Sequence, residues 1–204
     1  MTTATPAPAA DTPPPFRARR LLYVATGGIQ AMFTPMWLSW LRTGYPDLEV
    51  RTVLTAAARR FAGTTAIAAA GGRGLPTIDQ WPAEPDRALH VELADWPDAV
   101  VVHPATMNFV ARLSQGLADT PALLALQCTA APIVVCPALP PGGTRNPAYR
   151  RHVLELSERE NVSVLPPVHG VSLSTGAADI GTAALFPHAI AALEDLRAAT
   201  EATA

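Results

Sequence analysis

The residues best suited to chemistry in this chain stand together, directly after its most apolar run. The run 100–102 predicts a buried strand, and Pro104, Ala105, Thr106 and Asn108 then lead into a helix-patterned segment. In an open parallel sheet, ligands bind outside the carboxyl ends of the strands. The small side chain of Ala105 would let a planar ring approach closely, and Thr106 and Asn108 would offer it hydrogen bonds. Simple helix capping is the alternative interpretation of Asn108.

Two further turns have compositions that suit a bound anion. Gly27 and Gly28 follow the strand pattern 21–26 and precede a helical pattern, where backbone N–H groups favour a phosphate. The spaced third glycine and downstream acid of a dinucleotide fingerprint are missing, so phosphate is expected and NAD is not. Thr55 ends the next strand pattern, 48–54, as a phosphate ligand or a helix N-cap. Without a ligand, the two glycines would simply close a tight turn.

One histidine, His90, lies in the short stretch 89–93, which we interpret as an extended piece before a loop. Imidazole titrates near neutral pH, so a histidine can accept or release a proton during catalysis. A lone histidine is more often a surface or core residue, and spacing alone gives His90 no role. His103 is expected to face the other side of its strand, away from the ligand-binding turn.

The composition restricts the class of partner. The net charge is -2, and all fifteen basic residues are arginines scattered along the 204 residues, so neither nucleic acid nor an anionic membrane is expected. Cys128 and Cys136 lack metal-site spacing, so we expect no metal and no disulfide framework. No apolar stretch has the length of a membrane span, which predicts a soluble, cytoplasmic protein.

The order of the patterns predicts a disordered leader at 1–18, followed by a single α/β domain at 19–200. Strand patterns at 21–26, 48–54, 100–103, 133–136 and 162–165 alternate with helical patterns at 29–41, from 56, 108–117, 122–129, 146–159 and 187–200. This alternation predicts a Rossmann-like (flavodoxin-like) doubly wound parallel sheet, a three-layer sandwich with helices on both faces. The stretch 71–85 predicts an irregular connection, and the small polar stretch 170–181 predicts a flexible lid over the substrate.

Taken together, these turns resemble those of the homo-oligomeric flavin-containing cysteine decarboxylases. This family includes the lanthipeptide peptidyl-cysteine decarboxylases and phosphopantothenoylcysteine decarboxylase, and the resemblance covers roughly 21–196. The stretches 22–29 and 54–61 are similar to its two flavin phosphate elements, and 104–109 keeps the proline, first alanine, hydroxyl and asparagine of its Pro-Ala-Ser-Ala-Asn-Thr motif. His90 stands fourteen residues before Pro104, the family's separation between active-site histidine and motif.

The resemblance implies a cofactor, a substrate and an assembly. FMN is expected, with FAD as an alternative, and His90 and Asn108 are the expected catalytic residues. The substrate would be the C-terminal cysteine of a ribosomally made precursor peptide, converted into an aminoenethiol for an aminovinyl-cysteine ring, with other peptide-modifying enzymes as further partners. A homo-oligomer is implied, either a trimer or a dodecamer built from trimers, with flavin at the subunit contacts. The expected cofactor-binding residues are Gly27, Gly28, Thr55, Phe61, Pro104, Ala105, Thr106 and Asn108.

The chain departs from the family in its substrate loops. The family's Pro-x-Met-Asn-x-x-Met-Trp motif corresponds to 137–144, which keeps only the first proline and has Pro140 at the asparagine position. We therefore expect the backbone N–H groups of Gly142 and Gly143, or the side chain of Arg145, to hold the substrate carboxylate. This divergence resembles linaridin and lanthipeptide decarboxylases more than the pantothenate enzyme.

A late loop gives a second departure. Ser174 and Thr175 are the expected substrate contacts there, and Thr175 stands where phosphopantothenoylcysteine decarboxylase carries an electron-returning cysteine. Threonine cannot return electrons, so the product is expected to remain an oxidised enethiol. The alternatives are a phosphopantothenoylcysteine decarboxylase-like enzyme, a flavin prenyltransferase of the same fold and a non-catalytic flavin-binding regulatory protein.

Overall fold

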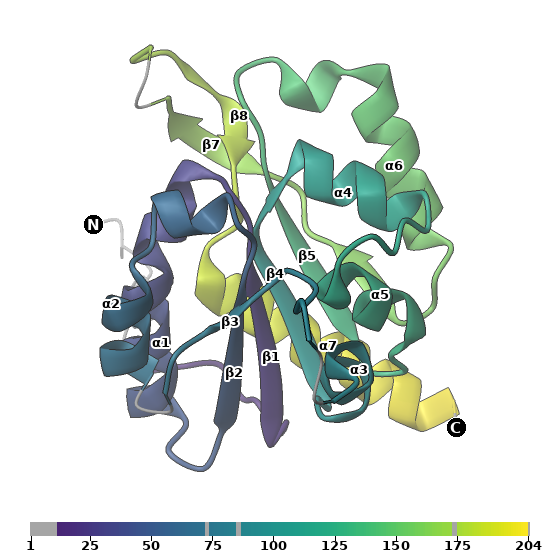
Figure 1. Ribbon diagram of the computed structural model, residues 1–204. Helices are drawn as coiled ribbons and strands as arrows, with labels where there is room; N and C mark the ends of the chain where they lie inside the picture. The colour runs from purple at the N-terminus through teal and green to yellow at the C-terminus, as the bar shows by residue number, and fades with distance from the viewer. Residues whose placement is uncertain (1–11, 72–73, 85–86, 173–174, 204) are drawn as a thin grey trace, which may run out of the picture.

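A six-stranded parallel sheet forms the centre of the molecule (Figure 1). The computed structural model describes residues 12–71, 74–84, 87–172 and 175–203. The strand order is β3-β2-β1-β4-β5-β6, and every neighbouring pair is parallel. The strands are β1 (Arg20–Ala25), β2 (Glu49–Leu54), β3 (Thr77–Ile78), β4 (Ala99–Thr106), β5 (Ile133–Ala138) and β6 (Val162–Val164). The predicted doubly wound α/β fold is confirmed.

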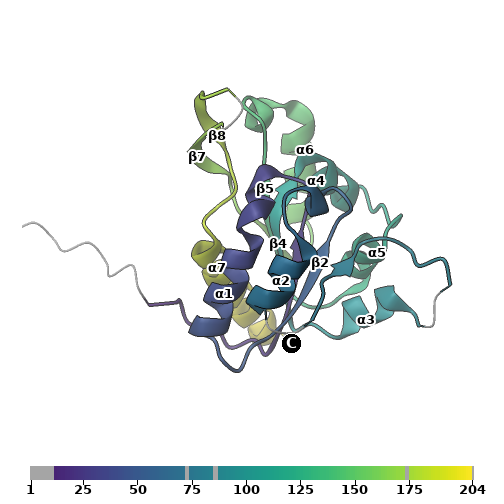
Figure 2. The same cartoon turned by 60° about the vertical axis from the view of Figure 1, so that its left-hand side comes forward.

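Helices cover both faces of the sheet and complete the three layers (Figure 2). Side chains of α1, α2 and α7 pack on one face, and those of α3, α4, α5 and α6 pack on the other. The helices are α1 (Thr34–Gly44), α2 (Thr64–Gly71), α3 (Leu89–Asp95), α4 (Met107–Ser114), α5 (Pro121–Cys128), α6 (Pro147–Ser157) and α7 (Phe186–Thr203). Short 3₁₀ helices lie at Ile29–Phe33, Ala58–Arg60 and Gly143–Arg145.

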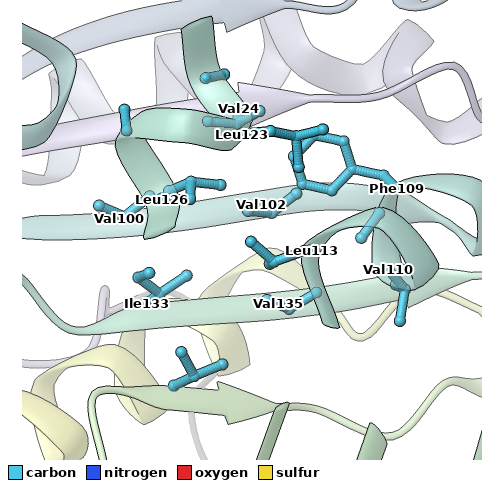
Figure 3. Close-up of a cluster of buried hydrophobic side chains, with 14 of the residues drawn as sticks. Val24, Val100, Val102, Phe109, Val110, Leu113, Leu123, Leu126, Ile133 and Val135 are labelled. Atoms are coloured by element: carbon cyan, nitrogen blue, oxygen red, sulfur yellow. The ribbon is translucent and has the colours of Figure 1, made fainter. Parts of the chain in front are cut away.

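The central strands are apolar throughout because both of their faces are covered. Val100, Val102 and Val135 point toward α4 and α5, where Phe109 and Leu123 pack against them (Figure 3). The intervening side chains of the same strands belong to the second core, beneath α1 and α7. This packing holds the strand ends in fixed positions, which a binding site at the sheet edge requires.

The strand order changes direction between β1 and β4. From β1 the chain adds β2 and β3 on one side, and then β4 returns beside β1 and continues outward to β5 and β6. Ligands of open α/β sheets bind at the carboxyl ends of the two strands that flank this point. The turn that contains Gly27 directly follows β1, and Pro104 lies near the carboxyl end of β4.

Three local predictions are wrong, each for a physical reason. The stretch that contains His90 is the helix α3, because Leu89 and Leu93 share one helix face and Leu93 is buried. β4 continues through Pro104, because after a register shift Ala105 and Thr106 still pair with Pro137 and Ala138 of β5. The helix expected from residue 56 is only the 3₁₀ turn Ala58–Arg60.

The stretch 170–181 is also more regular than predicted. β7 (Val168–Val171) and β8 (Ala178–Thr182) pair as an antiparallel hairpin beside the carboxyl end of the sheet (Figure 1). A Cβ added at Gly170 would lie 1.8 Å from the Thr182 hydroxyl oxygen. This glycine therefore serves strand packing, where the sequence pattern suggested flexibility.

The predicted leader extends too far into the fold. Residues 1–11 lie outside the described part, but the Tyr45 hydroxyl donates a hydrogen bond to the Pro14 carbonyl oxygen at 2.7 Å, and Phe16 packs edge-on against Tyr45. Ala18 is buried. The domain thus begins several residues before position 19. No helix in the described residues has both the length and the apolar character needed to cross a bilayer.

Candidate functional site

A buried threonine ties the two central strand ends together. The Thr26 hydroxyl donates to the Pro104 carbonyl oxygen and accepts from the Thr106 backbone N–H, both at 2.8 Å. Its own N–H donates to the same Pro104 oxygen at 3.1 Å. Thr26 was missing from the predicted site, although a hydroxyl at the end of an apolar strand pattern is a detectable signal.

The two glycines bring four strand ends into contact. A Cβ at Gly27 would lie 2.4 Å from the Ala57 Cβ, in the turn that follows β2. A Cβ at Gly28 would lie within 3.5 to 3.8 Å of side-chain carbons of Pro104, Thr106 and Ala138. The predicted turns after β1, β2 and β4 therefore meet at one edge, together with the end of β5.

Thr55 is placed at this edge but already has local partners. Its backbone N–H donates to the Ala25 carbonyl oxygen at 3.1 Å, and its hydroxyl accepts from the Ala58 N–H at 3.3 Å. The Thr55 hydroxyl thus bonds the first residue of the 3₁₀ turn, although Ala57 and not Thr55 is the N-cap residue of that turn. Phe61 ends the same turn and is partly exposed.

Thr106, and not Asn108, caps helix α4. The Thr106 hydroxyl accepts a hydrogen bond from the Phe109 N–H at 3.4 Å, so the capping interpretation of Asn108 is wrong. Asn108 lies in the first turn of α4 with its side chain exposed, while Ala105 is fully buried. The amide of Asn108 is therefore available to a ligand above the carboxyl ends of the strands.

His90 does not join these residues within one chain. Only three residues lie between the end of α3 and the start of β4, whereas α4 starts where β4 ends, so the length of β4 separates the two helices. Figures 1 and 2 both place them at opposite ends of the sheet. The half-buried His90 ring packs edge-on against Trp81, with the ring centroids 5.5 Å apart.

The loop after β5 and the hairpin meet at a charged contact. The Gly142 N–H donates to Asp179 Oδ2 at 2.8 Å, and the Gly143 N–H donates to the Pro140 carbonyl oxygen at 2.9 Å. Both N–H groups predicted to hold a substrate carboxylate thus have partners in the fold. Arg145 Nη1 lies 3.4 Å from Asp179 Oδ1. The Gly142 and Ile180 N–H groups, followed by the Arg145 charge, lower the pKa of Asp179.

The late-loop candidates lie on the turn of the hairpin. Thr175 is exposed, and its hydroxyl accepts from the Ala177 N–H at 3.3 Å. Ser174 lies outside the described residues. Neither prediction is tested by these contacts.

His103 faces away from the turn, as its strand position suggested. It is buried among Tyr23, Trp37 and Phe186, and its Nε2–H donates to the Ala184 carbonyl oxygen at 2.9 Å. Burial lowers the pKa of His103 to about 4. Within the described part of the chain, no group of three or more histidine, cysteine or acidic residues is arranged to hold a metal ion.

Apolar side chains stay exposed beside the glycine turn. Ile29, Met32 and Phe33 lie on the 3₁₀ helix after Gly28 and Met36 lies in the first turn of α1, and each is at least 39% exposed. A cavity of about 280 Å³ lies elsewhere, between the edge of β2 and α3, and none of the predicted site residues lines it. The turns therefore border an apolar surface that one chain leaves open.

Comparison with known proteins gives consistent results along nearly the whole chain. The Flavoprotein family matches residues 12–193. A cypemycin cysteine dehydrogenase (decarboxylating) from a Streptomyces species is 35% identical over 185 residues, which cover 89% of this chain and 94% of that protein. The coenzyme A biosynthesis bifunctional protein CoaBC of Haemophilus influenzae is 39% identical over 119 residues, but these cover only 28% of its length.

Solved structures show the same fold. The crystal structure of the cypemycin decarboxylase CypD has a TM-score of 0.72 and 32% identity, covering 90% of this chain and 96% of that one. The FMN-dependent cysteine decarboxylase SpaF has a TM-score of 0.75 and 30% identity, covering 88% and 97%. A PPC decarboxylase mutant complexed with pantothenoylaminoethenethiol has a TM-score of 0.71 and 26% identity, covering 88% and 98%.

Proposed function

The chain belongs to the Flavoprotein family, and we propose that within it the protein is an FMN-dependent peptidyl-cysteine decarboxylase. Its substrate is the C-terminal cysteine of a ribosomally made precursor peptide, and its product is an aminoenethiol. The observation that carries this proposal is the similarity to a decarboxylating cysteine dehydrogenase over 94% of that relative's length. The match to CoaBC covers a much smaller part of that protein, which makes phosphopantothenoylcysteine the weaker substrate candidate.

The turns at the carboxyl edge fit the cofactor. Gly27 lets the turns after β1 and β2 pack closely, and Gly28 follows it at the start of a helical segment, where backbone N–H groups favour a phosphate group. Thr55 stands beside this turn through its bond to Ala25. Ala105, expected to face the ring, is fully buried in the core beneath this edge. Gly27, Gly28 and Thr55 would hold the ribityl phosphate, which suits FMN.

When bound, the flavin supplies the sink for the two electrons that leave the cysteine thiol. Oxidation of the thiol gives a thioaldehyde with loss of two protons. The bond to the carboxylate then breaks, carbon dioxide leaves, and the electron pair of that bond forms the enethiolate. Asn108, exposed above β4, is proposed to orient the reacting cysteine against the ring edge. A separate oxidant must restore the flavin after each turnover.

His90 is the proposed acceptor of the thiol proton. Since α3 lies at the far end of the sheet from α4, this role requires the His90 of a second copy of the chain to face the first copy's turns. The exposed apolar side chains of Met32, Phe33 and Met36 beside those turns support such a contact. The proposed assembly is therefore a homo-oligomer, a trimer or a dodecamer of trimers.

The product is proposed to leave as the oxidised enethiol. Thr175 has no thiol to return electrons, so the carbon–carbon double bond is retained. Addition of this enethiol to a dehydrated residue would close an aminovinyl-cysteine ring, for which other peptide-modifying enzymes are the proposed partners.

Mass spectrometry of candidate precursor peptides tests the proposal. Incubation of the purified yellow protein with peptides ending in cysteine should remove about 46 mass units, carbon dioxide plus two hydrogens. Phosphopantothenoylcysteine and dimethylallyl phosphate serve as comparison substrates and should remain unchanged. A colourless protein that takes up no added FMN would overturn the proposal.

A further inference from the structure

The loop after β5 already binds a carboxylate, and that carboxylate belongs to the hairpin. Asp179 Oδ2 accepts from the Gly142 N–H at 2.8 Å, and Asp179 Oδ1 lies 3.4 Å from Arg145 Nη1. Oδ1 also accepts from the Ile180 N–H at 2.8 Å. Two donors from one loop thus converge on the two oxygens of a single carboxylate.

The loop is shaped so that its donors point to the same place. Gly142 has φ of 81°, a left-handed conformation that favours glycine, and the 3₁₀ turn Gly143–Arg145 follows directly. Backbone N–H groups in such turns, together with an arginine, make a common arrangement for binding carboxylates. The Arg145 side chain is 69% exposed and that of Asp179 only 22%, so the guanidinium can also be reached from solvent.

The loop starts at the edge where the cofactor turns meet. Ala138, the last residue of β5, pairs with Thr106 and would contact a Cβ placed at Gly28. The chain then passes through Leu139, whose N–H donates to the Gly181 carbonyl oxygen at 2.7 Å. The carboxylate contact is thus four residues beyond a position that borders the proposed ring site.

We infer that the Gly142 N–H and Arg145 form the site for the terminal carboxylate of the substrate, which Asp179 occupies until the substrate displaces it. This inference rests on the proposed function. The carboxylate is also the group that leaves as carbon dioxide, so the product no longer competes for the site. Asp179 then rebinds and favours release of the product. The Leu139–Gly181 hydrogen bond keeps β8 attached while Asp179 moves.

The inference makes Asp179 a competitor of the substrate, which a purely structural residue would not be. Asp179→Asn keeps an oxygen that can accept from the Gly142 N–H but removes the negative charge near Arg145. It should therefore strengthen the binding of a free carboxylate and leave the binding of a carboxamide unchanged. Arg145→Gln should weaken carboxylate binding selectively.

Equilibrium binding to the FMN-loaded protein tests this competition without turnover. The probes are acetyl-Gly-Gly-Ser with a free C-terminal carboxylate and the same peptide as its carboxamide, titrated by NMR. Wild type should prefer the acid, Asp179→Asn should bind the acid several-fold more tightly, and Arg145→Gln should lose the acid preference, on the order of tenfold. Asp47→Asn is the matched control, because Asp47 is an exposed carboxylate with a 3.9 Å partner, Arg19. It should behave as wild type.

Three results would overturn the inference: no acid preference in wild type, an unchanged preference in Arg145→Gln, or equal weakening of both probes in Asp179→Asn. The last result would make Asp179 a structural residue only. Failure of the proposed function is separate, because it is measured by the loss of carbon dioxide from cysteine peptides. An active wild type with no change in probe preference would refute the carboxylate site alone.

Discussion

The Thr26 hydroxyl accepts the backbone N–H of Thr106 at 2.8 Å, and so joins the first strand of the sheet to the cap of α4. The same hydroxyl donates to the carbonyl oxygen of Pro104, a residue that lacks an N–H. β4 can therefore continue past a proline without leaving these groups unpaired. The geometry of the proposed flavin-binding turn depends on a side chain from another strand.

Thr26→Val should destabilise the protein and weaken its hold on flavin. The change keeps the shape of the side chain but leaves the Thr106 N–H without its acceptor, at a cost of about 1–3 kcal/mol in the free energy of unfolding. Urea unfolding and the flavin Kd measure the two effects. Thr43→Val is the control: it removes an exposed hydroxyl that donates to the Ser39 carbonyl oxygen, and it should change stability by less than about 0.5 kcal/mol. Equal effects of both variants would contradict a special role for Thr26.

Gly27→Ala should impair flavin binding through a steric clash. The new Cβ would lie 2.4 Å from the Ala57 Cβ, so the turns after β1 and β2 must move apart where the phosphate is proposed to bind. We expect the flavin Kd to rise by on the order of tenfold or more, equivalent to about 1.4 kcal/mol. Gly63→Ala is the control, because no other atom lies within 4 Å of its added Cβ. Full flavin occupancy in Gly27→Ala would argue against this placement of the phosphate.

Local residue patterns were sufficient to predict five of the six strands of the sheet and the tight turn at Gly27, but not β3 or the continuation of β4 through Pro104. Small residues and proline restrict the backbone directly, so such turns can be recognised from neighbouring residues alone. The stretch 89–93 was assigned wrongly because its apolar residues alternate as in a strand, while Leu89 and Leu93 also share a helix face. Packing against α5 decides between the two patterns.

The contact between Gly142 and Asp179 could not be predicted in the same way. These residues are 37 positions apart and meet only because β8 returns to the end of β5. The glycines at 170 and 181 suggested a flexible loop, but each one allows a close approach between backbone and neighbour. Long-range pairing of this kind leaves no local signal in the sequence.

The stability of the protein should fall as the pH decreases from about 6.5 toward 4. Burial lowers the pKa of His103 to about 4, so the unfolded chain binds a proton in this range that the folded chain does not. The contribution of His103 to the free energy of unfolding should fall by roughly 3 kcal/mol, at about 1.4 kcal/mol per pKa unit. Urea unfolding of wild type and His103→Gln across this range isolates the contribution. A parallel pH dependence in the two proteins would exclude His103 as the source.

His90→Asn should lose turnover while keeping flavin and assembly. General base catalysis contributes on the order of 100-fold or more, so decarboxylation should slow by that amount with an unchanged flavin spectrum. Asn108→Ala should also be slow, because the amide proposed to orient the substrate is removed. Unchanged turnover in His90→Asn would reject this histidine as the base.

The separation of α3 from α4 makes a stronger prediction for a mixture of these two variants. If His90 acts on the flavin site of a neighbouring copy, co-expressed His90→Asn and Asn108→Ala chains form some sites with both residues intact. Random mixing in a head-to-tail trimer should restore about a quarter of all sites, and about a third of the sites in trimers that contain both variants. Differently tagged chains, purified through both tags, ensure that only mixed oligomers are assayed, and each variant co-expressed with itself under two tags is the control. A shared site must recover activity when each chain supplies the residue that the other lacks. Mixed oligomers as slow as the parent variants would therefore mean that His90 and Asn108 do not act across a subunit contact.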